Sequence, residues 1–286
     1  MRSLFTVPAP IRLSARPSEV SPASLLAALV PPPQFAHASF ESYVPDPDHP
    51  SQQAARAALE AVAAQLVAPK RKGLFRKAAP AATSVYLDGG YGVGKTHLLA
   101  SLAHAVGPQR SAYGTFVEYT HLVGALGFAA CVAALSQRSL VAIDEFELDD
   151  PGDTVLMSRL LRELADAGVT LVATSNTLPE ALGEGRFAAE DFLREIQVLA
   201  SRFSVMRIDG PDYRHRTGKA EHHARVDADV VGDANELANN GRVVALEGWD
   251  DLLGHLATIH PSRYGAPVDG LEALIVTGAH AIADDM

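Results

Sequence analysis

The 286-residue chain is poor in cysteine, in aromatic residues and in basic charge. Its single cysteine, Cys131, excludes an internal disulfide framework and suits a reducing compartment. Basic residues number 24 against 34 acidic ones, and the net charge of −10 argues against non-specific binding to a polyanion as the main role, although a local basic stripe stays compatible with it. No apolar run approaches the roughly 20 residues that cross a bilayer, and the N-terminus lacks a hydrophobic signal core. These absences predict a soluble, cytoplasmic protein that is not integral to a membrane.

The character of the sequence changes near residues 50 and 210. Residues 1–50 are rich in proline, which disfavours long regular elements, so we interpret them as an N-terminal arm laid on the domain surface. Residues 51–210 carry the strongest periodic patterns, beginning with an apolar helical stripe from Ser51 to about Leu66. Residues 211–286 predict a small C-terminal α+β appendage.

From Val85 onward, strand-like and helix-like segments alternate, which is typical of a parallel sheet with helices on both faces. Short apolar runs suited to buried strands lie at 84–87, 115–119, 139–143, 169–174 and 204–208. Helices are expected at 97–106, 122–135, 154–167 and 188–199. The appendage is expected to contain strands 225–231 and 242–246 joined by a hairpin turn at Asn239-Asn240-Gly241, helix 249–259 and strand 273–277. We therefore predict a three-layer α/β domain with a five-stranded, mainly parallel sheet.

A glycine-rich stretch joins the first of these strands to the helix that follows. It runs Gly89-Gly90-Tyr91-Gly92-Val93-Gly94-Lys95-Thr96-His97 and matches the pattern G-x-x-x-x-G-K-[ST] at every fixed position. Such a loop turns its N–H groups toward an anion, while Lys95 reaches the β and γ phosphate oxygens and Thr96 ligates Mg²⁺. We expect the stretch to bind a nucleoside triphosphate; the alternative is a strand-to-helix turn without a ligand. Tyr91 either shields the nucleotide or is simply exposed, and His97 is expected to pack against the first helical turn.

Polar residues follow two later strands, where open α/β sheets place their ligands. Asp144 is expected to hold Mg²⁺, mostly through water, and Glu145 to act as the general base or to orient the attacking water. The alternative is a strand whose end simply reaches solvent. Asn176 follows the next strand, and its amide would position the water beside the γ-phosphate if the two strands are neighbours. An ordinary asparagine at a strand-to-loop turn is the alternative there.

Between Asp144 and Arg214 the spacing of residues is more specific than the phosphate loop alone. The matching segments are Ile143-Asp144-Glu145-Phe146, Asp150, Asp153, Arg159-Leu160-Leu161, Val172-Ala173-Thr174-Ser175-Asn176, Leu178-Pro179, Phe192-Leu193, Ile196 and Asp212-Tyr213-Arg214. Together they resemble the ZapE cell-division ATPase family, a branch of the AAA+-like P-loop ATPases, over about residues 35–216. The resemblance implies an AAA+-like P-loop fold and hydrolysis of ATP with Mg²⁺, coupled to a protein partner. In bacteria the family is associated with the division ring, so it also implies FtsZ or another ring component as partner and recruitment to the division site.

The sequence departs from this family just before the pair Phe192-Leu193. Ala189 and Asp191 stand where the family carries arginines. AAA+-like ATPases use an arginine from a neighbouring subunit to stabilise charge on the γ-phosphate. The resemblance therefore implies a homo-oligomer that shares an arginine, with Arg186 as the first candidate and Arg202 as the second. For each, the alternative is a surface arginine in a salt bridge.

The C-terminal part is a second departure, because the family's closing helical segment does not align after Trp249. Arg214 and Arg216 remain candidates for a nucleotide-sensing arginine. Two other classes of function also stay open. One is an ATP-gated binding module whose turnover is incidental. The other is a loader acting on DNA or on a helicase, which the basic loop Lys70–Lys77 favours and the acidic total opposes. No guanine-selecting Asn-Lys-x-Asp run is present, and base preference beyond the family's ATP stays open.

Overall fold

The structure is a computed structural model that describes residues 9–16, 21–68, 83–147, 151–177, 201, 203–213, 227–258, 265–268 and 270–278. Contacts divide the chain into two units. We call Pro22–Gly218 the sheet unit, and Met1–Ser21 together with Lys219–Met286 the terminal unit. The proline-rich N-terminal segment is therefore divided between the two units, whereas the sequence predicted boundaries at residues 50 and 210.

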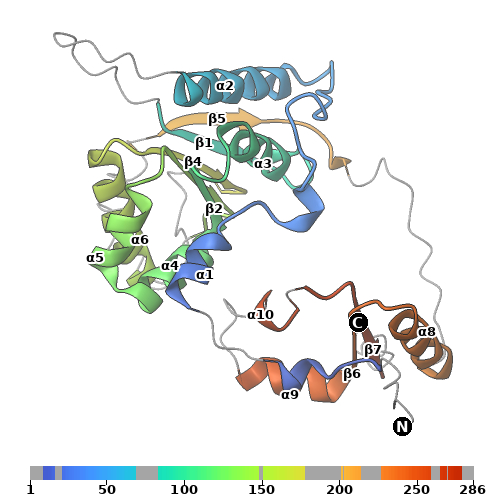
Figure 1. Ribbon diagram of the computed structural model, residues 1–286. Coiled ribbons are helices and arrows are strands. Elements are labelled where there is room, and N and C mark those ends of the chain that lie inside the picture. Colours follow the sequence, from blue (N-terminus) through green and yellow to red (C-terminus); the bar gives the residue numbers. More distant parts are fainter. Residues whose placement is uncertain are drawn as a thin grey trace. The chain divides into compact units, whose positions relative to one another are not determined.

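A parallel sheet forms the middle layer of the sheet unit (Figure 1). Its strand order is β2-β3-β4-β1-β5, and every neighbouring pair is parallel. The strands are β1 (Val85–Gly89), β2 (Ser111–Thr115), β3 (Leu140–Asp144), β4 (Thr170–Ser175) and β5 (Ser204–Ile208). The predicted α/β fold with a five-stranded parallel sheet is confirmed. Because β3 lies between β2 and β4, the residues that follow β3 and β4 emerge side by side.

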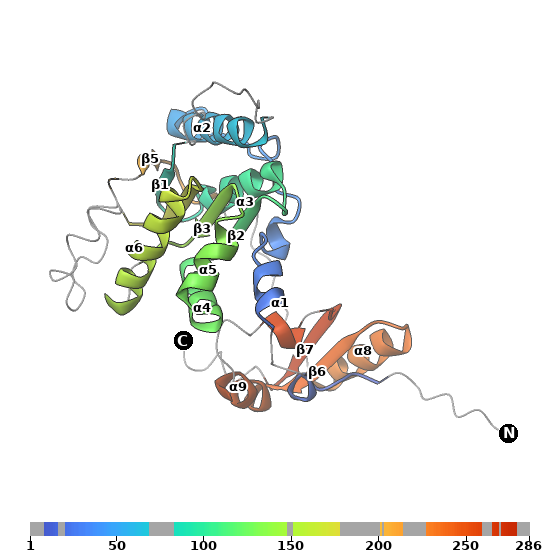
Figure 2. The same cartoon turned by 60° about the vertical axis from the view of Figure 1, so that its left-hand side comes forward.

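Helices cover both faces of this sheet (Figures 1 and 2). One face carries α2 (Pro50–Val67) and α3 (Lys95–Val106), and the other carries α4 (Phe116–Leu126), α5 (Phe128–Leu135) and α6 (Pro151–Asp166). Strand residues alternate between two separate cores, as the pleat requires: Tyr86 belongs to the core under α4, α5 and α6, and Leu87 to the core under α2 and α3. Short elements, α1 (Pro22–Ala27) and the 3-10 turn η2 (Pro33–Phe35), precede α2. The sheet unit is thus a three-layer sandwich.

The strand expected at 115–119 is wrong, because the structure places β2 at Ser111–Thr115 and begins α4 immediately afterwards. Thr115 caps that helix: its hydroxyl accepts the Glu118 N–H at 3.3 Å, and the Glu118 carboxylate accepts the Thr115 N–H at 2.6 Å. This reciprocal pair is a capping box, a signal the sequence carries as Thr-x-x-Glu. The apolar residues after Thr115 therefore continue as a helix.

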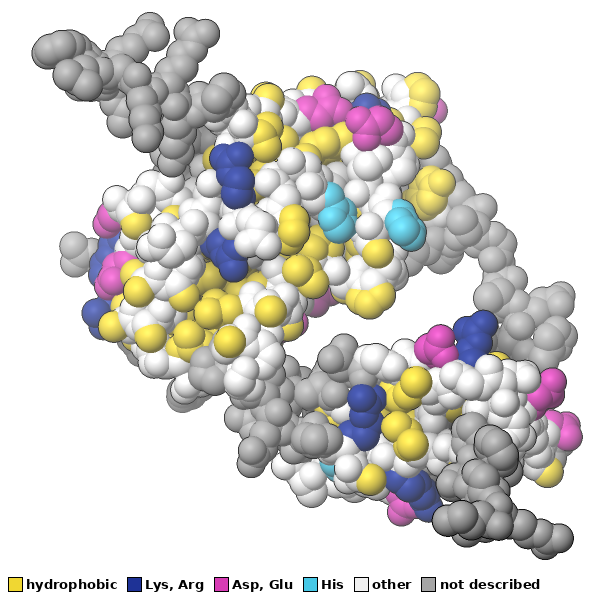
Figure 3. Space-filling model, viewed as in Figure 1, with side chains coloured by type: hydrophobic (Ala, Val, Ile, Leu, Met, Phe, Trp, Pro, Cys, Tyr) yellow, Lys and Arg dark blue, Asp and Glu magenta, His cyan; other side chains and the backbone are white. Residues whose placement is uncertain are grey.

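The helix expected at 122–135 is interrupted at Gly127, whose φ of 80° lies in the left-handed region that favours glycine. The two pieces, α4 and α5, meet at 119°. Hydrophobic side chains are visible on the surface over these helices (Figure 3), and Ala129, Ala130 and Ala133 of α5 are exposed. Among the described residues no single helix is long and apolar enough to cross a membrane; only this bent pair passes that test of length and composition, when taken together.

The terminal unit is built on two parallel strands, β6 (Val244–Gly248) and β7 (Ala273–Thr277). Helices α8 (Asp227–Asn239), α9 (Trp249–Thr258) and α10 (Gly265–Val268) complete it. Ile11, near the N-terminus, forms an isolated parallel bridge with Ala245, so the start of the chain adds to the free edge of β6. The buried Glu247 carboxylate accepts hydrogen bonds from the Leu13 N–H at 2.7 Å and from the Arg12 guanidinium at 2.8 Å. A charge-assisted contact therefore ties the first described residues to this small sheet.

The hairpin predicted around Asn239-Asn240-Gly241 is also wrong. Residues from Asp227 to Asn239 form α8 instead of a strand. Gly241 ends this helix with a φ of 81°: its N–H donates to the Ala238 carbonyl, and the next N–H, that of Arg242, donates to Leu237. This pair of bonds is the Schellman arrangement at a helix C-terminus. The Asn-Gly pair thus terminates a helix here. The two observed strands, β6 and β7, are joined by a crossover that contains α9.

Candidate active site

The phosphate loop leaves β1 at Gly89 and enters α3 at Lys95, as the motif predicts. Gly92 and Gly94 have φ values of 69° and 90°, a region that side chains with a Cβ rarely adopt. Space gives a second reason for glycine at both positions. A Cβ on Gly92 would overlap the Asp212 carboxylate, and one on Gly94 would overlap the ring of Tyr43. The loop conformation therefore depends on glycine at these two places.

Lys95 lies at the centre of the site and is mostly buried. Its ammonium donates to the Gly89 carbonyl at 2.5 Å, to the Gly90 carbonyl at 2.7 Å and to the Asn176 side-chain oxygen at 2.8 Å. Burial lowers the pKa of Lys95, while the charges of Asp88, Asp144 and Glu147 raise it. These carboxylates favour a positive charge where a nucleotide would bring its phosphates.

Asp144 ends β3 next to the start of α3. Its carboxylate accepts hydrogen bonds from the Tyr113 hydroxyl at 2.7 Å, the Thr174 hydroxyl at 2.5 Å and the Thr96 hydroxyl at 3.2 Å. Burial, together with the adjacent Asp144 charge, raises the pKa of Tyr113, so this phenol stays a donor. Tyr113 and Thr174 thus fix the carboxylate that the sequence assigned to the metal. The sequence did not single out either of them, although their strands flank β3.

A hydroxyl beside a carboxylate is a donor set that fits Mg²⁺, a hard cation that prefers oxygen ligands. Thr96 and Asp144 supply this pair from α3 and β3. No cluster of three or more His, Cys, Asp or Glu side chains suited to a metal occurs within the part of the chain that the structure describes. Mg²⁺ usually keeps several waters and is bound through one or two carboxylates together with substrate phosphates.

Glu145 has an unusual backbone: its φ of 52° makes it the one non-glycine residue with positive φ among those described. Its N–H donates to the Thr174 hydroxyl at 3.2 Å, and the following residue, Phe146, is buried and donates its N–H to the Thr174 carbonyl at 2.7 Å. The chain is therefore held on both sides while the Glu145 side chain is exposed. Uncommon backbone conformations of this kind cluster at functional sites.

Asn176 follows β4, and β4 pairs directly with β3. The sequence placed Asn176 at the site only if its strand neighbours the strand of Asp144. This is the case, and Asn176 emerges beside Asp144 and Glu145. Its side chain contacts Lys95, and its N–H donates to the Glu147 carboxylate at 3.2 Å. Glu147 is a further residue that sequence reasoning missed, since only its place two positions after Glu145 hinted at a role.

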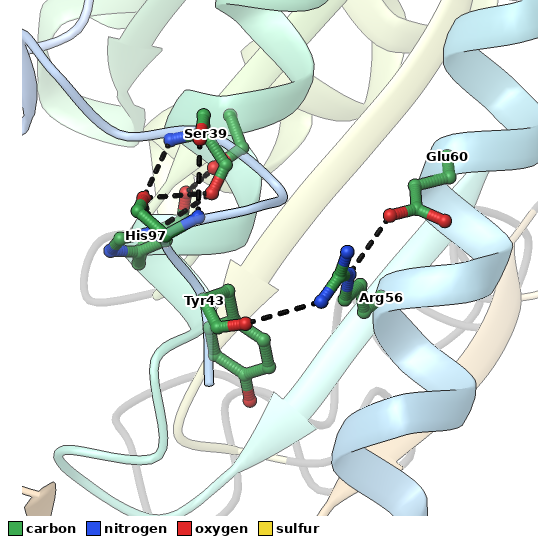
Figure 4. Close-up of polar contacts among 7 residues, drawn as sticks. Ser39, Tyr43, Arg56, Glu60 and His97 are labelled. Atoms are coloured by element: carbon green, nitrogen blue, oxygen red, sulfur yellow. Dashed lines mark hydrogen bonds and ion pairs between the residues drawn. The ribbon is translucent and has the colours of Figure 1, made fainter. Parts of the chain in front are cut away.

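A strap formed by residues 35–44 lies along the phosphate loop (Figure 4). The Tyr43 hydroxyl donates to the Val93 carbonyl at 3.0 Å, and burial raises the pKa of Tyr43 to about 12. The His97 ring nitrogen Nε2 lies 2.9 Å from the Ser42 hydroxyl and 3.1 Å from the Ser39 carbonyl. The Tyr43 carbonyl also lies 3.4 Å from the Arg56 guanidinium, which pairs with Glu60 on α2. His97 thus connects the first turn of α3 to the strap.

These elements enclose a cleft of about 430 Å³. Its lining joins the phosphate loop to the polar ends of β3 and β4 and to the strap: Phe35, Ser42, Tyr43, Val44, Gln52, Tyr91, Gly92, Val93, Gly94, Lys95, Thr96, His97, Asp144, Glu145, Thr174, Ser175, Asn176, Pro211 and Tyr213. Of the other residues predicted to bind nucleotide, Gly89 and Gly90 hold Lys95 through their carbonyls. Tyr91 is 68% exposed. Arg186 and Arg202, the predicted shared arginines, lie outside the described residues, as do Arg214, Arg216, the basic loop and the helix expected at 188–199.

The phosphate loop follows β1, and the Asp-Glu pair lies at the end of β3, which is separated from β1 by β4 alone. This strand order and these two motifs define a P-loop nucleoside triphosphatase fold. The model of the AFG1-like ATPase family matches residues 19–240. The chain therefore belongs to the AFG1-like ATPase family. The resemblance to the ZapE family in the spaced residues after Asp144 is confirmed by this match and by the relatives below.

The chain matches two curated relatives over only part of the length of each. The chain is 32% identical over 144 residues to the cell division protein ZapE of Escherichia coli strain K12, which covers 46% of this chain and 38% of that protein. It is 29% identical over 184 residues to an uncharacterised protein of Schizosaccharomyces pombe, covering 54% and 40%. The chain thus spans about two fifths of the length of these relatives. Among solved structures, DnaI aligns with a TM-score of 0.47 at 18% identity, covering 62% of this chain and 94% of DnaI.

Proposed function

We propose that this chain is an Mg²⁺-dependent ATPase whose hydrolytic cycle alters its contact with a protein partner. The observation that supports this most is convergence: Lys95, Thr96, Asp144, Glu145 and Asn176 come from three separate segments and line one cleft. Phosphoryl transfer relies on positioning and charge stabilisation, which such a set supplies. Family membership supports ATP as the nucleotide.

Each side chain has a role that follows from its place. Lys95 binds phosphate oxygens after leaving the two loop carbonyls that it now contacts. Thr96 and Asp144 would hold Mg²⁺, which when bound neutralises phosphate charge. Glu145, exposed directly after the C-terminal end of β3, takes a proton from the attacking water. Asn176 contacts Lys95 and is placed to sense the terminal phosphate.

We further propose a division-ring component, with FtsZ as the first candidate, as the partner. The support is the relative named cell division protein ZapE, together with the family resemblance. The shared arginine remains part of this proposal: Arg186, or else Arg202, would reach the γ-phosphate of a neighbouring copy. A lone subunit would then hydrolyse ATP slowly and an assembly faster.

Replacing Glu145 by Gln tests hydrolysis directly. Turnover should fall on the order of 10²–10⁴-fold because the base is lost, while ATP affinity should stay within about twofold. The matched control is Glu236→Gln, an exposed glutamate on α8 that should change neither quantity. Binding without turnover in the unaltered protein would instead favour an ATP-gated binding module.

Turnover measured against protein concentration, with and without FtsZ polymer, tests the assembly and the partner. A rate per subunit that rises with concentration supports a shared site, and stimulation by polymer supports the partner. A strictly constant rate without stimulation contradicts both. Salt-dependent binding to single-stranded DNA that is lost when Lys70, Arg71 and Lys72 become Ala would favour the DNA or helicase loader instead.

A further inference from the structure

Both oxygens of the Glu147 carboxylate, two residues beyond Glu145, accept hydrogen bonds from the last residue of β4 and the turn that follows it. One oxygen accepts the Ser175 hydroxyl at 2.8 Å and the Asn176 N–H at 3.2 Å, and the other accepts the Thr177 hydroxyl at 3.1 Å. Three donors from three successive residues therefore meet one side chain. An ionised carboxylate suits them because it only accepts hydrogen bonds, through two oxygens.

The same turn is held from its other side. The Thr177 N–H donates to the Ser175 hydroxyl at 2.9 Å, and the Thr177 carbonyl accepts the Tyr86 hydroxyl at 2.8 Å. Tyr86 is buried in β1, and its ring meets that of Phe146, the buried residue just before Glu147, at 6.2 Å edge to face. The buried neighbour Phe146 thus anchors Glu147 to the core, and the Glu147 carboxylate holds the turn in position.

Asn176 is the only one of these three turn residues whose side chain contacts Lys95 in the described part of the chain. Its backbone is bound to Glu147 and its amide oxygen to Lys95, so the position of the amide depends on the Glu147 carboxylate. Among the described residues that line the cleft, Asn176 is present and Glu147 is not. Glu147 therefore makes no contact with a nucleotide in the cleft, and besides its charge, which raises the pKa of Lys95, its route to the site is the Asn176 N–H.

We propose that Glu147 is a positioning residue that fixes Asn176 in the orientation in which its amide distinguishes a triphosphate from a diphosphate. This inference rests on the proposed function of the cleft. Glu147 is no second general base, because both of its oxygens accept hydrogen bonds from the turn, whereas the Glu145 side chain is exposed. Replacement of Glu147 should free the turn and leave the phosphate loop intact.

A double-mutant cycle tests this route. The preference for a non-hydrolysable ATP analogue over ADP, measured by calorimetry, is compared in the unaltered chain, Glu147→Ala, Asn176→Ala and the double variant. Each single change should reduce the preference on the order of tenfold, as expected when a hydrogen bond involving a charged group is lost. The double variant should match Asn176→Ala, because Glu147 has nothing left to position. Glu147→Gln, which keeps an acceptor oxygen, should recover part of the preference.

The matched control is Glu118→Ala. It also removes a carboxylate that accepts a hydrogen bond from a backbone N–H at the end of a strand of the same sheet, but Glu118 lies away from the turn. It should leave the preference unchanged, although it costs stability. Multiplicative losses in the double variant, or a preference that Glu147→Ala leaves intact, would overturn the inference. If Glu147→Ala does not fold, the same preference is measured in Glu147→Gln and in the double variant Glu147→Gln/Asn176→Ala. The double variant should again match Asn176→Ala.

Turnover separates this inference from the proposed function. If the unaltered chain hydrolyses ATP and Glu147→Ala keeps its full preference, the positioning role fails and the ATPase stands. If the unaltered chain binds ATP without hydrolysis and the cycle is non-additive, hydrolysis fails and the positioning role stands.

Discussion

The two units of this chain differ in how they are stabilised. The sheet unit buries two large hydrophobic clusters, one on each face of a five-stranded sheet. Among its described residues, the terminal unit buries a hydrophobic cluster of three, Leu13, Ala245 and Leu252, at a two-stranded sheet, and the buried Glu247 carboxylate holds the N-terminal residues. Burial of apolar area is the main source of folding free energy, so the two units should differ widely in stability.

The comparison also explains where the site is. A cleft lined by the ends of several parallel strands needs neighbours on both sides of the strand that carries the carboxylates. The sheet unit offers this, since β3 lies between β2 and β4 and each contributes a hydroxyl to Asp144. The large core thus provides a rigid base for loops that hold unusual backbone conformations, at Gly92, Gly94 and Glu145.

Each unit contains one natural probe. Cys131, the only cysteine in the chain, is buried in the sheet unit, and burial raises the pKa of its thiol to about 11. Alkylation near pH 8 should therefore require unfolding of that unit, because the thiolate is the reactive form. Trp249, the only tryptophan, packs against the small core of the terminal unit. Thiol labelling and tryptophan fluorescence can follow the two units separately in one denaturant titration.

The largest expected effect is on the core of the sheet unit. Leu99 of α3 is fully buried, so Leu99→Ala should lower the free energy of unfolding of the sheet unit by about 2–5 kcal/mol. The Cys131 labelling midpoint should move to lower denaturant, whereas the Trp249 transition should stay in place because the cores share no residue. Val117→Ala, at a half-exposed position on α4, is the control. A joint shift of both probes would show that the units unfold as one.

Nucleotide should act on one unit only. ATP with Mg²⁺ at about 100 times Kd should stabilise the sheet unit by about 2.7 kcal/mol, because ligand that binds only the folded state shifts the unfolding equilibrium. Cys131 should resist labelling to higher denaturant, and the Trp249 midpoint should not change. The stabilisation should vanish in Lys95→Ala, which removes the ammonium at the centre of the cleft. Equal stabilisation of the Trp249 transition would place nucleotide contacts in the terminal unit as well.

Sequence patterns predicted the sheet unit well because β1, β3 and β4 are buried along their whole length, although the edge strand β5 is largely exposed. The strand at 204–208 was predicted at its observed bounds, and four of the five strands were found within one or two residues. The exception, the segment 115–119, is instructive. Its Val and Tyr residues favour a strand, but the capping box of Thr115 and Glu118 starts a helix there.

The chemical residues of the site were predictable, and those that support them were not. Lys95, Thr96, Asp144, Glu145 and Asn176 follow motifs whose spacing is set by the chemistry, and the structure brings them together. The supporting contacts depend on which strands are neighbours and on which side each residue points, and a single sequence does not show either. Tyr113, Thr174 and Glu147 are of this second kind, as is the strap that reaches His97 from before α2.

The smallest expected effect tests the least predictable region. Asn240-Gly241 is typical of a hairpin turn, yet the structure makes it the end of α8, with Gly241 at a φ of 81°. Gly241→Ala should destabilise the terminal unit by about 1 kcal/mol, because an alanine disfavours this conformation. The same substitution at Gly232, in the interior of α8 with nothing within 4 Å of an added Cβ, should stabilise it by about 0.5–1 kcal/mol, since alanine favours helix. Opposite shifts of the Trp249 midpoint therefore identify a helix, whereas in a hairpin Gly232 would lie at the end of a strand and its replacement by alanine would bring no gain.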